Sequence, residues 1–132
     1  MDIEVDRRAL RRYAVGDLVV IALFVAIGEF SHGANPLLVA NAYVQTVVTF
    51  VIGWILAGPL IGAYRSDTLT DPRRAIVVPV VAWAVADAIG QGLRATAFFE
   101  GDAEVTFFLV VFFVGGAMIG AWRYVAFRWL GQ

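Results

Sequence analysis

Residues 75–99 read AIVVPVVAWAVADAIGQGLRATAFF, an apolar run that is interrupted by Asp87, Gln91 and Arg94. A run of this length is typical of a helix that crosses a lipid bilayer, because the hydrocarbon core needs about 20 apolar residues. Asp71 followed by Pro72 predicts the start of this helix, with Asp71 as the N-cap residue and Pro72 at the first helical position. An ionisable group in lipid is costly unless it has a partner or a water-filled cavity, so Asp87 and Arg94 are functional candidates.

Three further apolar stretches of similar length occur at about 14–33, 43–64 and 105–127. Backbone groups in lipid must form hydrogen bonds within their own segment, so these runs favour helices. The alternation of apolar and polar residues that is typical of strands in a small membrane barrel is missing. With 61% hydrophobic residues and a mean hydropathy of +0.79, the composition is that of a membrane protein. We expect an all-α polytopic fold with four transmembrane helices in a single domain, residues 1–132.

The distribution of arginine predicts how the helices are oriented. All ten basic residues are arginine, and the first and third connections, 31–41 and 100–104, contain none. The arginines assigned to the opposite side are Arg7, Arg8, Arg11, Arg12, Arg65, Arg73, Arg74, Arg123 and Arg128. Because basic residues favour the cytoplasmic side, we expect both termini inside, residues 1–12 as a cytoplasmic tail, and insertion in the cytoplasmic (plasma) membrane.

The composition also limits which partners and which kinds of functional site the chain can have. A net charge of −1 argues against nucleic acid as a partner, and the absence of cysteine removes disulfides, thiolate metal sites and cysteine nucleophiles. One histidine is weak support for a metal or haem, so we expect neither a metal nor a cofactor. Arginine without lysine is typical of a high-GC genome, for which a salt-loving archaeon is one source that fits.

The second and fourth apolar stretches end alike. ILAGPLIGAYR at 55–65 aligns with FVGGAMIGAWR at 113–123, a shift of 58 residues that also places Glu29 on Asp87. A duplicated two-helix unit would explain both matches, with the two copies related by an axis along the membrane normal. Coincidence between two helices rich in glycine and alanine is the alternative. We therefore expect two tandem two-helix repeats, with Glu29 about 18 Å from the inner interface if Asp17 marks it.

Polar and amphipathic side chains at helical spacing form the predicted pathway for a substrate or ion. Its members are Asp17, Glu29, Ser31, His32, Gln45, Trp83, Asp87, Gln91 and Arg94. Asp87 and Arg94 are two turns apart, so Gln91 or a water would have to bridge them, and pairing of Arg94 with Glu29 across helices is the alternative. The acids are either proton acceptors or cation ligands, or they only fix helix packing. His32 is expected to titrate near neutral pH, and Trp83 alone is more often a core residue.

Two GxxxG patterns lie near the ends of the second and fourth stretches. They comprise Gly58 with Gly62 and Gly116 with Gly120. Small residues at this spacing let helices approach closely, so the four glycines predict either packing within the chain or dimerisation.

The stretch GDLVVIALFVAIGEFSHG at 16–33 resembles an uncharacterised prokaryotic membrane family, domain of unknown function 3054. The similarity covers most of the chain, and its signature is the aspartate followed by Gly-x-x-Ser-His-Gly. The resemblance implies that Asp17, Ser31 and His32 belong to a site. Members often carry arginine where this chain has Glu29, which argues against a fixed proton-carrying role for Glu29. The family has no established activity.

Together these patterns favour a small transporter, proton-coupled or specific for a small solute. Four helices barely enclose a path, so we expect a homodimer or a partner membrane protein in the bilayer. The alternative is a non-transporting scaffold or subunit of a larger membrane complex, with structural polar pairs. A membrane-embedded enzyme is less favoured, because no catalytic motif occurs at a recognisable spacing.

Overall fold

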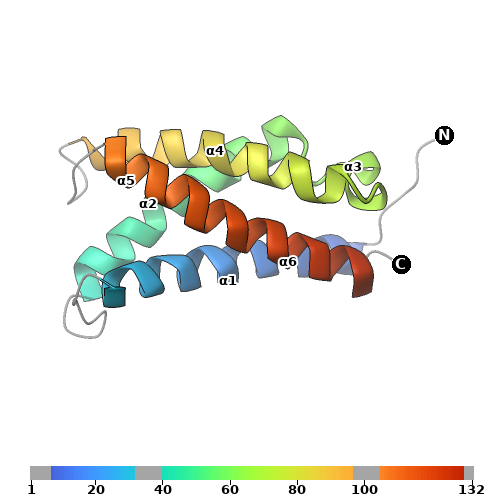
Figure 1. Ribbon diagram of the computed structural model, residues 1–132, viewed down its shortest axis with the longest axis horizontal. Coiled ribbons are helices and arrows are strands. Elements are labelled where there is room, and N and C mark those ends of the chain that lie inside the picture. Colours follow the sequence, from blue (N-terminus) through green and yellow to red (C-terminus); the bar gives the residue numbers. More distant parts are fainter. Residues whose placement is uncertain (1–6, 32–39, 97–104, 130–132) are drawn as a thin grey trace.

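The computed structural model describes residues 7–31, 40–96 and 105–129, in which every regular element is a helix. The elements are α1 (Arg7–Ser31), α2 (Ala40–Ile61), α3 (Ser66–Thr70), α4 (Arg74–Arg94), α5 (Val105–Val110), the π-helical turn η1 (Val111–Gly115) and α6 (Gly116–Trp129). The last three follow one another as a single rod (Figure 1).

Three helices of the described part are long and apolar enough to cross a membrane. They cover Tyr43–Ile61, Arg74–Arg94 and Thr106–Trp129. Only part of α1 has described side chains, although its helix runs for 25 residues. The described part of the chain is therefore all-α, and its three candidate spans indicate a multi-pass membrane protein.

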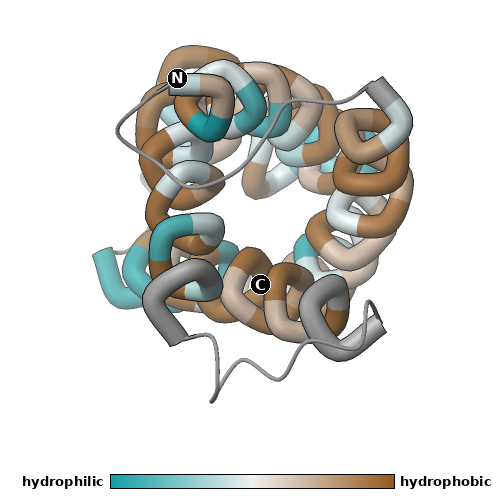
Figure 2. Tube along the Cα trace, turned by 90° about the vertical axis from the view of Figure 1, so that its left-hand side faces the viewer, coloured by the Kyte–Doolittle hydropathy of each residue, from teal (hydrophilic) through white to brown (hydrophobic). Residues whose placement is uncertain are grey.

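The long helices surround a common axis (Figure 2). α2 packs between α1 and α4, and α6 packs between α4 and α1, so α1 lies opposite α4 and α2 opposite α6. The α2–α4 contact is the most extensive, and backbone meets backbone there: a Cβ added to Gly53 would lie 2.4 Å from the carbonyl oxygen of Ala86. A side chain at Gly53 would therefore push these helices apart.

Two helices end earlier than the apolar pattern predicts. α2 stops at Ile61 instead of residue 64, because Gly62 adopts a φ of 101° and the Ala63 amide donates back to the Gly58 carbonyl at 2.8 Å. That left-handed conformation suits glycine and ends the helix. α4 stops at Arg94, short of the predicted residue 99. At the other end, α4 begins at Arg74 with Arg73 as its N-cap residue, two residues after the N-cap that the sequence predicts. Asp71 Oδ1 accepts hydrogen bonds from the Arg73 and Arg74 amides, so it caps the turn that leads into the helix.

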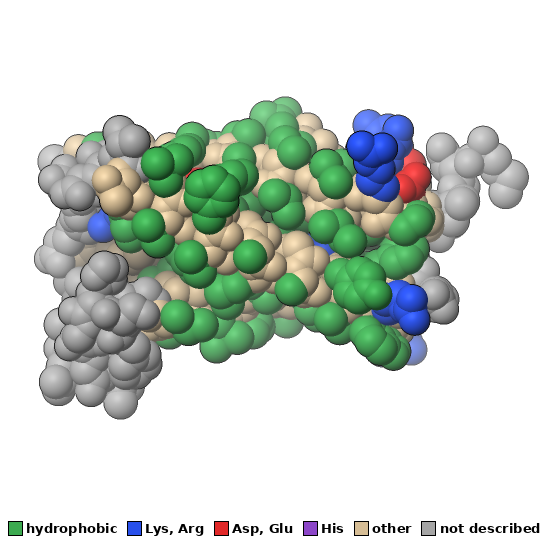
Figure 3. Space-filling model, in the orientation of Figure 1, with side chains coloured by type: hydrophobic (Ala, Val, Ile, Leu, Met, Phe, Trp, Pro, Cys, Tyr) green, Lys and Arg blue, Asp and Glu red, His purple; other side chains and the backbone are tan. Residues whose placement is uncertain are grey.

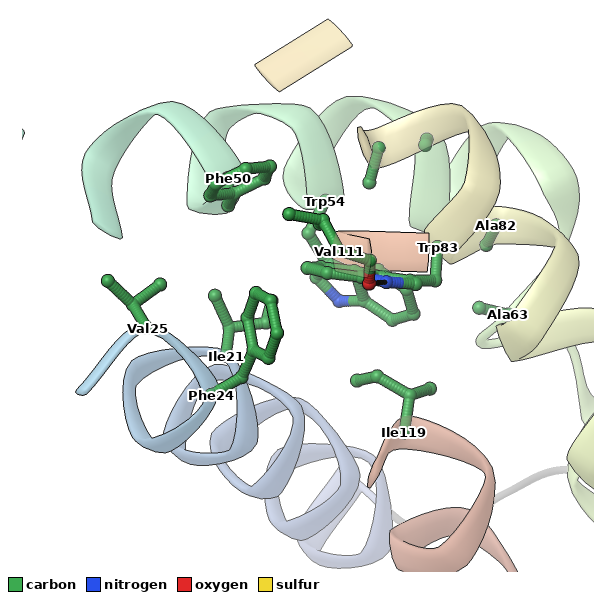
Figure 4. Packing of buried hydrophobic residues seen from close by; sticks show 12 residues of the cluster. Ile21, Phe24, Val25, Phe50, Trp54, Ala63, Ala82, Trp83, Val111 and Ile119 are labelled. Carbon is green, nitrogen blue, oxygen red and sulfur yellow. Dashed lines mark hydrogen bonds between the residues drawn. The ribbon is translucent and has the colours of Figure 1, made fainter. Parts of the chain in front are cut away.

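Aromatic rings fill the centre of the bundle (Figure 4). The Trp83 ring centroid lies 5.9 Å from that of Phe24, 5.8 Å from that of Phe50 and 6.5 Å from that of Trp54. The indole nitrogen of Trp83 also donates to the Val111 carbonyl at 2.9 Å. A π-helical turn disturbs the regular backbone ladder, and here a side chain from α4 supplies a donor to a carbonyl in that turn.

The surface of the bundle separates into an apolar middle and a charged end (Figure 3). Leu60, Phe113 and Ile55 are among the large side chains that face outward, with 81%, 66% and 58% of their surface exposed. α1 begins, α6 ends and α3 lies at the same end, where arginines gather; we refer to it as the arginine-rich end (Figures 1 and 3). An extended apolar surface of this kind is suited to contact with lipid.

Candidate functional site

A buried ion pair joins the first and last helices close to the arginine-rich end. Arg123 of α6 donates to both oxygens of Asp17 of α1, from Nε at 2.9 Å and from an Nη at 2.7 Å. Both side chains are completely shielded from solvent. A pair this deeply buried is stable only if its remaining hydrogen-bonding atoms are also satisfied.

Further donors satisfy the pair. Trp122 Nε1 donates to one Asp17 oxygen at 2.9 Å, and the Tyr64 hydroxyl donates to the other. The remaining Nη of Arg123 donates to the Ala63 carbonyl at 2.9 Å. Trp54 Nε1 donates to the Tyr64 hydroxyl at 2.7 Å, which completes a chain of contacts that joins α1, α2, the turn after α2 and α6. We call Asp17, Trp54, Tyr64, Trp122 and Arg123 the Asp17 network.

The Arg123 guanidinium also packs against aromatic faces. Its central carbon lies 5.1 Å from the ring centroids of both Tyr13 and Tyr64. Cation–π contacts of this kind are strengthened by the exclusion of water. The network is thus a saturated structural clamp, with no oxygen of Asp17 left over for a ligand.

Sequence reasoning missed the role of Arg123, because counting arginines assigned it to the inner interface. The repeat carried the overlooked signal: Tyr64 and Trp122 occupy equivalent positions, 58 residues apart, and both donate to Asp17. Arg65, the equivalent of Arg123, is exposed instead.

A second polar group lies on α4. Asp87 is completely buried, and its Oδ1 accepts a hydrogen bond from the Gln91 amide at 3.3 Å. Arg94 donates to the Gln91 side-chain oxygen at 3.5 Å, and its guanidinium carbon lies 4.5 Å from the Phe107 ring centroid. Gln91 thus bridges the two charged residues through long hydrogen bonds, which is one of the two arrangements that the spacing predicts. We call Asp87, Gln91 and Arg94 the Asp87 stripe.

Not every buried polar atom of the Asp87 stripe is satisfied. Asp87 Oδ2 is buried and has no hydrogen-bond partner in the described part of the chain. A buried polar atom without a partner is destabilising and is rare in native proteins, so it calls for a functional or chemical explanation. A proton, a cation or a water bound at this oxygen would supply one.

The other predicted pathway residues are placed as follows. Trp83 belongs to the aromatic core, one turn before Asp87 on α4. Gln45 of α2 is half-buried. Glu29 and Ser31 are in the last turn of α1, with side chains outside the described set, and His32 lies outside the described residues altogether. Pairing of Glu29 with Arg94 therefore stays a prediction.

The glycines of the two GxxxG patterns have different surroundings. Gly116 of α6 faces Trp83 and Val80 of α4, at ordinary packing distance for an added Cβ. Gly120 faces Val80 and Ile76 at similar distances. Gly62, for which the pattern predicts helix packing, instead ends α2. Gly58 faces the rings of the Asp17 network.

An exposed ion-pair cluster occupies the arginine-rich end. Asp67 of α3 lies 3.2 Å from Arg65 and 3.0 Å from Arg74. Desolvation raises the pKa of Asp67, but the hydrogen bond and charge of Arg65 and the charge of Arg74 together outweigh it and lower the pKa. Such exposed pairs contribute little to stability and are screened by salt.

No group of three histidine, cysteine, aspartate or glutamate side chains that could hold a metal ion occurs among the described residues.

Comparison with known protein families assigns the chain to one of them. The family model described as Protein of unknown function (DUF3054) matches residues 14–126, so the chain belongs to this family. No curated protein and no solved structure matches the chain. The match covers both the Asp17 network and the Asp87 stripe.

Proposed function

We propose that this member of the DUF3054 family is a four-span transporter of the plasma membrane whose Asp87 stripe binds a proton or a small cationic solute within the bilayer. The observation that carries the proposal is the unsatisfied, fully buried Oδ2 of Asp87. Intramembrane carboxylates with this environment are typical of proton relays and ion pathways.

In this proposal α1 is the fourth span, and both termini are cytoplasmic. The start of α1 and the end of α6 share the arginine-rich end, which supports placing them on one side (Figure 1). Exposed arginines at that end include Arg65, Arg73, Arg74 and Arg128. Their number agrees with a cytoplasmic assignment, because arginine is enriched in cytoplasmic loops.

The proposal includes a tandem repeat of two helical hairpins, α1–α2 and α4–α6. The order around the bundle supports it, because a two-fold axis along the bundle would exchange α1 with α4 and α2 with α6, which lie opposite each other. The equivalent donors Tyr64 and Trp122 on Asp17 add a second, independent correspondence.

The Asp87 stripe contains both a binding group and a countercharge. Loading a proton or cation on Asp87 would neutralise the carboxylate, and Gln91 connects that change to Arg94 seven residues further along α4. Because Trp83 and its neighbours fill the bundle centre, a straight path through one copy is closed in this conformation. The proposal therefore includes a homodimer in which α4 moves during transport.

Flux into liposomes tests this proposal. Purified protein is reconstituted with a pH-sensitive dye inside, a membrane potential is imposed, and wild type is compared with Asp87→Asn. Asp67→Asn is the matched control, since it makes the same chemical change at an exposed site outside the three candidate spans. Proton flux that is lost in Asp87→Asn and kept in Asp67→Asn supports the proposal.

The second candidate is a non-transporting membrane scaffold. The saturated Asp17 network and the filled aromatic centre favour it, because both stabilise one closed conformation. Wild-type flux no greater than that of empty liposomes, repeated with a panel of small cations, would favour the scaffold over the transporter.

A further inference from the structure

An apolar groove lies on the outer surface between α1 and α2, close to the arginine-rich end. Its volume is about 170 Å³, and it is lined by Ala14, Leu18, Trp54, Ile55, Pro59 and Tyr64. The polar side-chain atoms of the residues that line it already form hydrogen bonds within the protein, since Trp54 Nε1 donates to the Tyr64 hydroxyl, which in turn donates to Asp17. The groove therefore suits an apolar occupant.

The face of α1 that lines this groove also carries two arginines, nearer the start of the helix. Arg7, Arg11, Ala14 and Leu18 follow one another at intervals of four, three and four residues, which places them on one face of the helix. Arg11 precedes Ala14 by about 4.5 Å along the helix axis. Both arginines are exposed, and neither forms an ion pair with the residues of 7–31, 40–96 and 105–129.

We propose that this groove binds an anionic phospholipid. One acyl chain would lie along Ala14 and Leu18 over the Trp54 ring, and the phosphate would lie beside Arg11 and Arg7. Apolar contact at membrane depth with basic side chains at the adjoining interface is the chemistry that recognises such a lipid. This inference does not depend on transport.

A second copy of the chain fits this surface less well. A symmetric dimer through the groove brings the same patch of both copies together, so the Arg7–Arg11 stripes would come close to each other. Like charges brought together at an interface oppose association. A lipid phosphate instead complements these charges.

Native mass spectrometry of the detergent-solubilised protein tests the site, with dioleoylphosphatidylglycerol and dioleoylphosphatidylcholine as the competing probes. Wild type should retain the anionic lipid in preference to the zwitterionic one. Arg11→Gln should reduce this preference about fivefold, whereas Arg12→Gln, an exposed neighbour on another face, should leave it nearly unchanged.

Filling the groove provides an independent arm of the same test. Ala14→Phe should displace the anionic lipid, whereas Val15→Phe should not, because Val15 is 54% exposed and does not line the groove. The proposal is overturned by equal effects of Arg11→Gln and Arg12→Gln, by equal retention of the two lipids, or by unchanged retention in Ala14→Phe. If the protein is a dimer that Ala14→Phe dissociates and Val15→Phe does not, and lipid retention stays unchanged, the groove is a protein interface and the lipid proposal is overturned.

Discussion

Replacing Asp17 with asparagine should strongly destabilise the bundle. Asp17 accepts four hydrogen bonds, two from Arg123, one from Trp122 and one from Tyr64. An asparagine of the same shape has only one acceptor oxygen, so its amide NH₂ would face a donor whichever way it turns. The guanidinium would also lose its countercharge while it stays buried. Breaking a buried pair by removing one partner costs about 3–5 kcal/mol, and we expect Asp17→Asn to fall in this range.

A double-mutant cycle separates this effect from a general loss of packing. We expect Arg123→Gln to cost a similar amount, and the double variant to cost far less than the sum of the two, with a coupling of about 2–3 kcal/mol. Equilibrium unfolding in mixed micelles, followed by tryptophan fluorescence, measures all four proteins. The coupling should change little between low and high salt, because the pair is shielded from solvent. Single variants that each lose less than about 1 kcal/mol, the range of an exposed pair, would refute the assignment of this network as a clamp.

Three further predictions concern packing and surface charge. Gly53→Val should destabilise the protein by at least about 2 kcal/mol in the same unfolding assay, since its side chain meets the α4 backbone, whereas Gly92→Ala, with open space around it, should be neutral or slightly stabilising. Trp83→Phe should cost about 1–3 kcal/mol by leaving a carbonyl of η1 without its donor, whereas Trp129→Phe, at an exposed position, should change stability little. Because the pKa of Asp67 is lowered on folding, the ionised carboxylate should stabilise the protein fully above its unfolded pKa of about 4. This stabilisation should disappear as the pH falls through the folded pKa. A difference in unfolding free energy between wild type and Asp67→Asn that persists at lower pH would contradict this.

Much of the helical framework can be predicted from the sequence, because long apolar runs in lipid have few alternatives to a helix. The start of α4 was predictable to within two residues. Asp71 is a favoured N-cap residue and its side chain accepts hydrogen bonds from the following amides, but the N-cap position of α4 is occupied by Arg73. The end of α2 was harder to predict. Gly62 occurs in the same Ile-Gly-Ala-aromatic-Arg string as Gly120, yet only Gly62 adopts the left-handed conformation, so local sequence does not distinguish the two.

The candidate site was predictable only where its members share one helix. The spacing of Asp87, Gln91 and Arg94 places them on one face of α4, and the hydrogen bonds follow that order. The Asp17–Arg123 pair joins residues 106 positions apart, so its formation depends on how α1 and α6 pack. Charge counting could not reveal it, because a buried arginine and an interfacial one look alike in the sequence.

The most direct test of the central proposal is the initial rate of proton uptake into liposomes that contain equal amounts of wild-type, Asp87→Asn or Asp67→Asn protein. We expect uptake above empty liposomes for wild type and Asp67→Asn, and uptake at the level of empty liposomes for a correctly folded Asp87→Asn. Wild-type and Asp87→Asn rates that are equal and above background would contradict a transport role for Asp87.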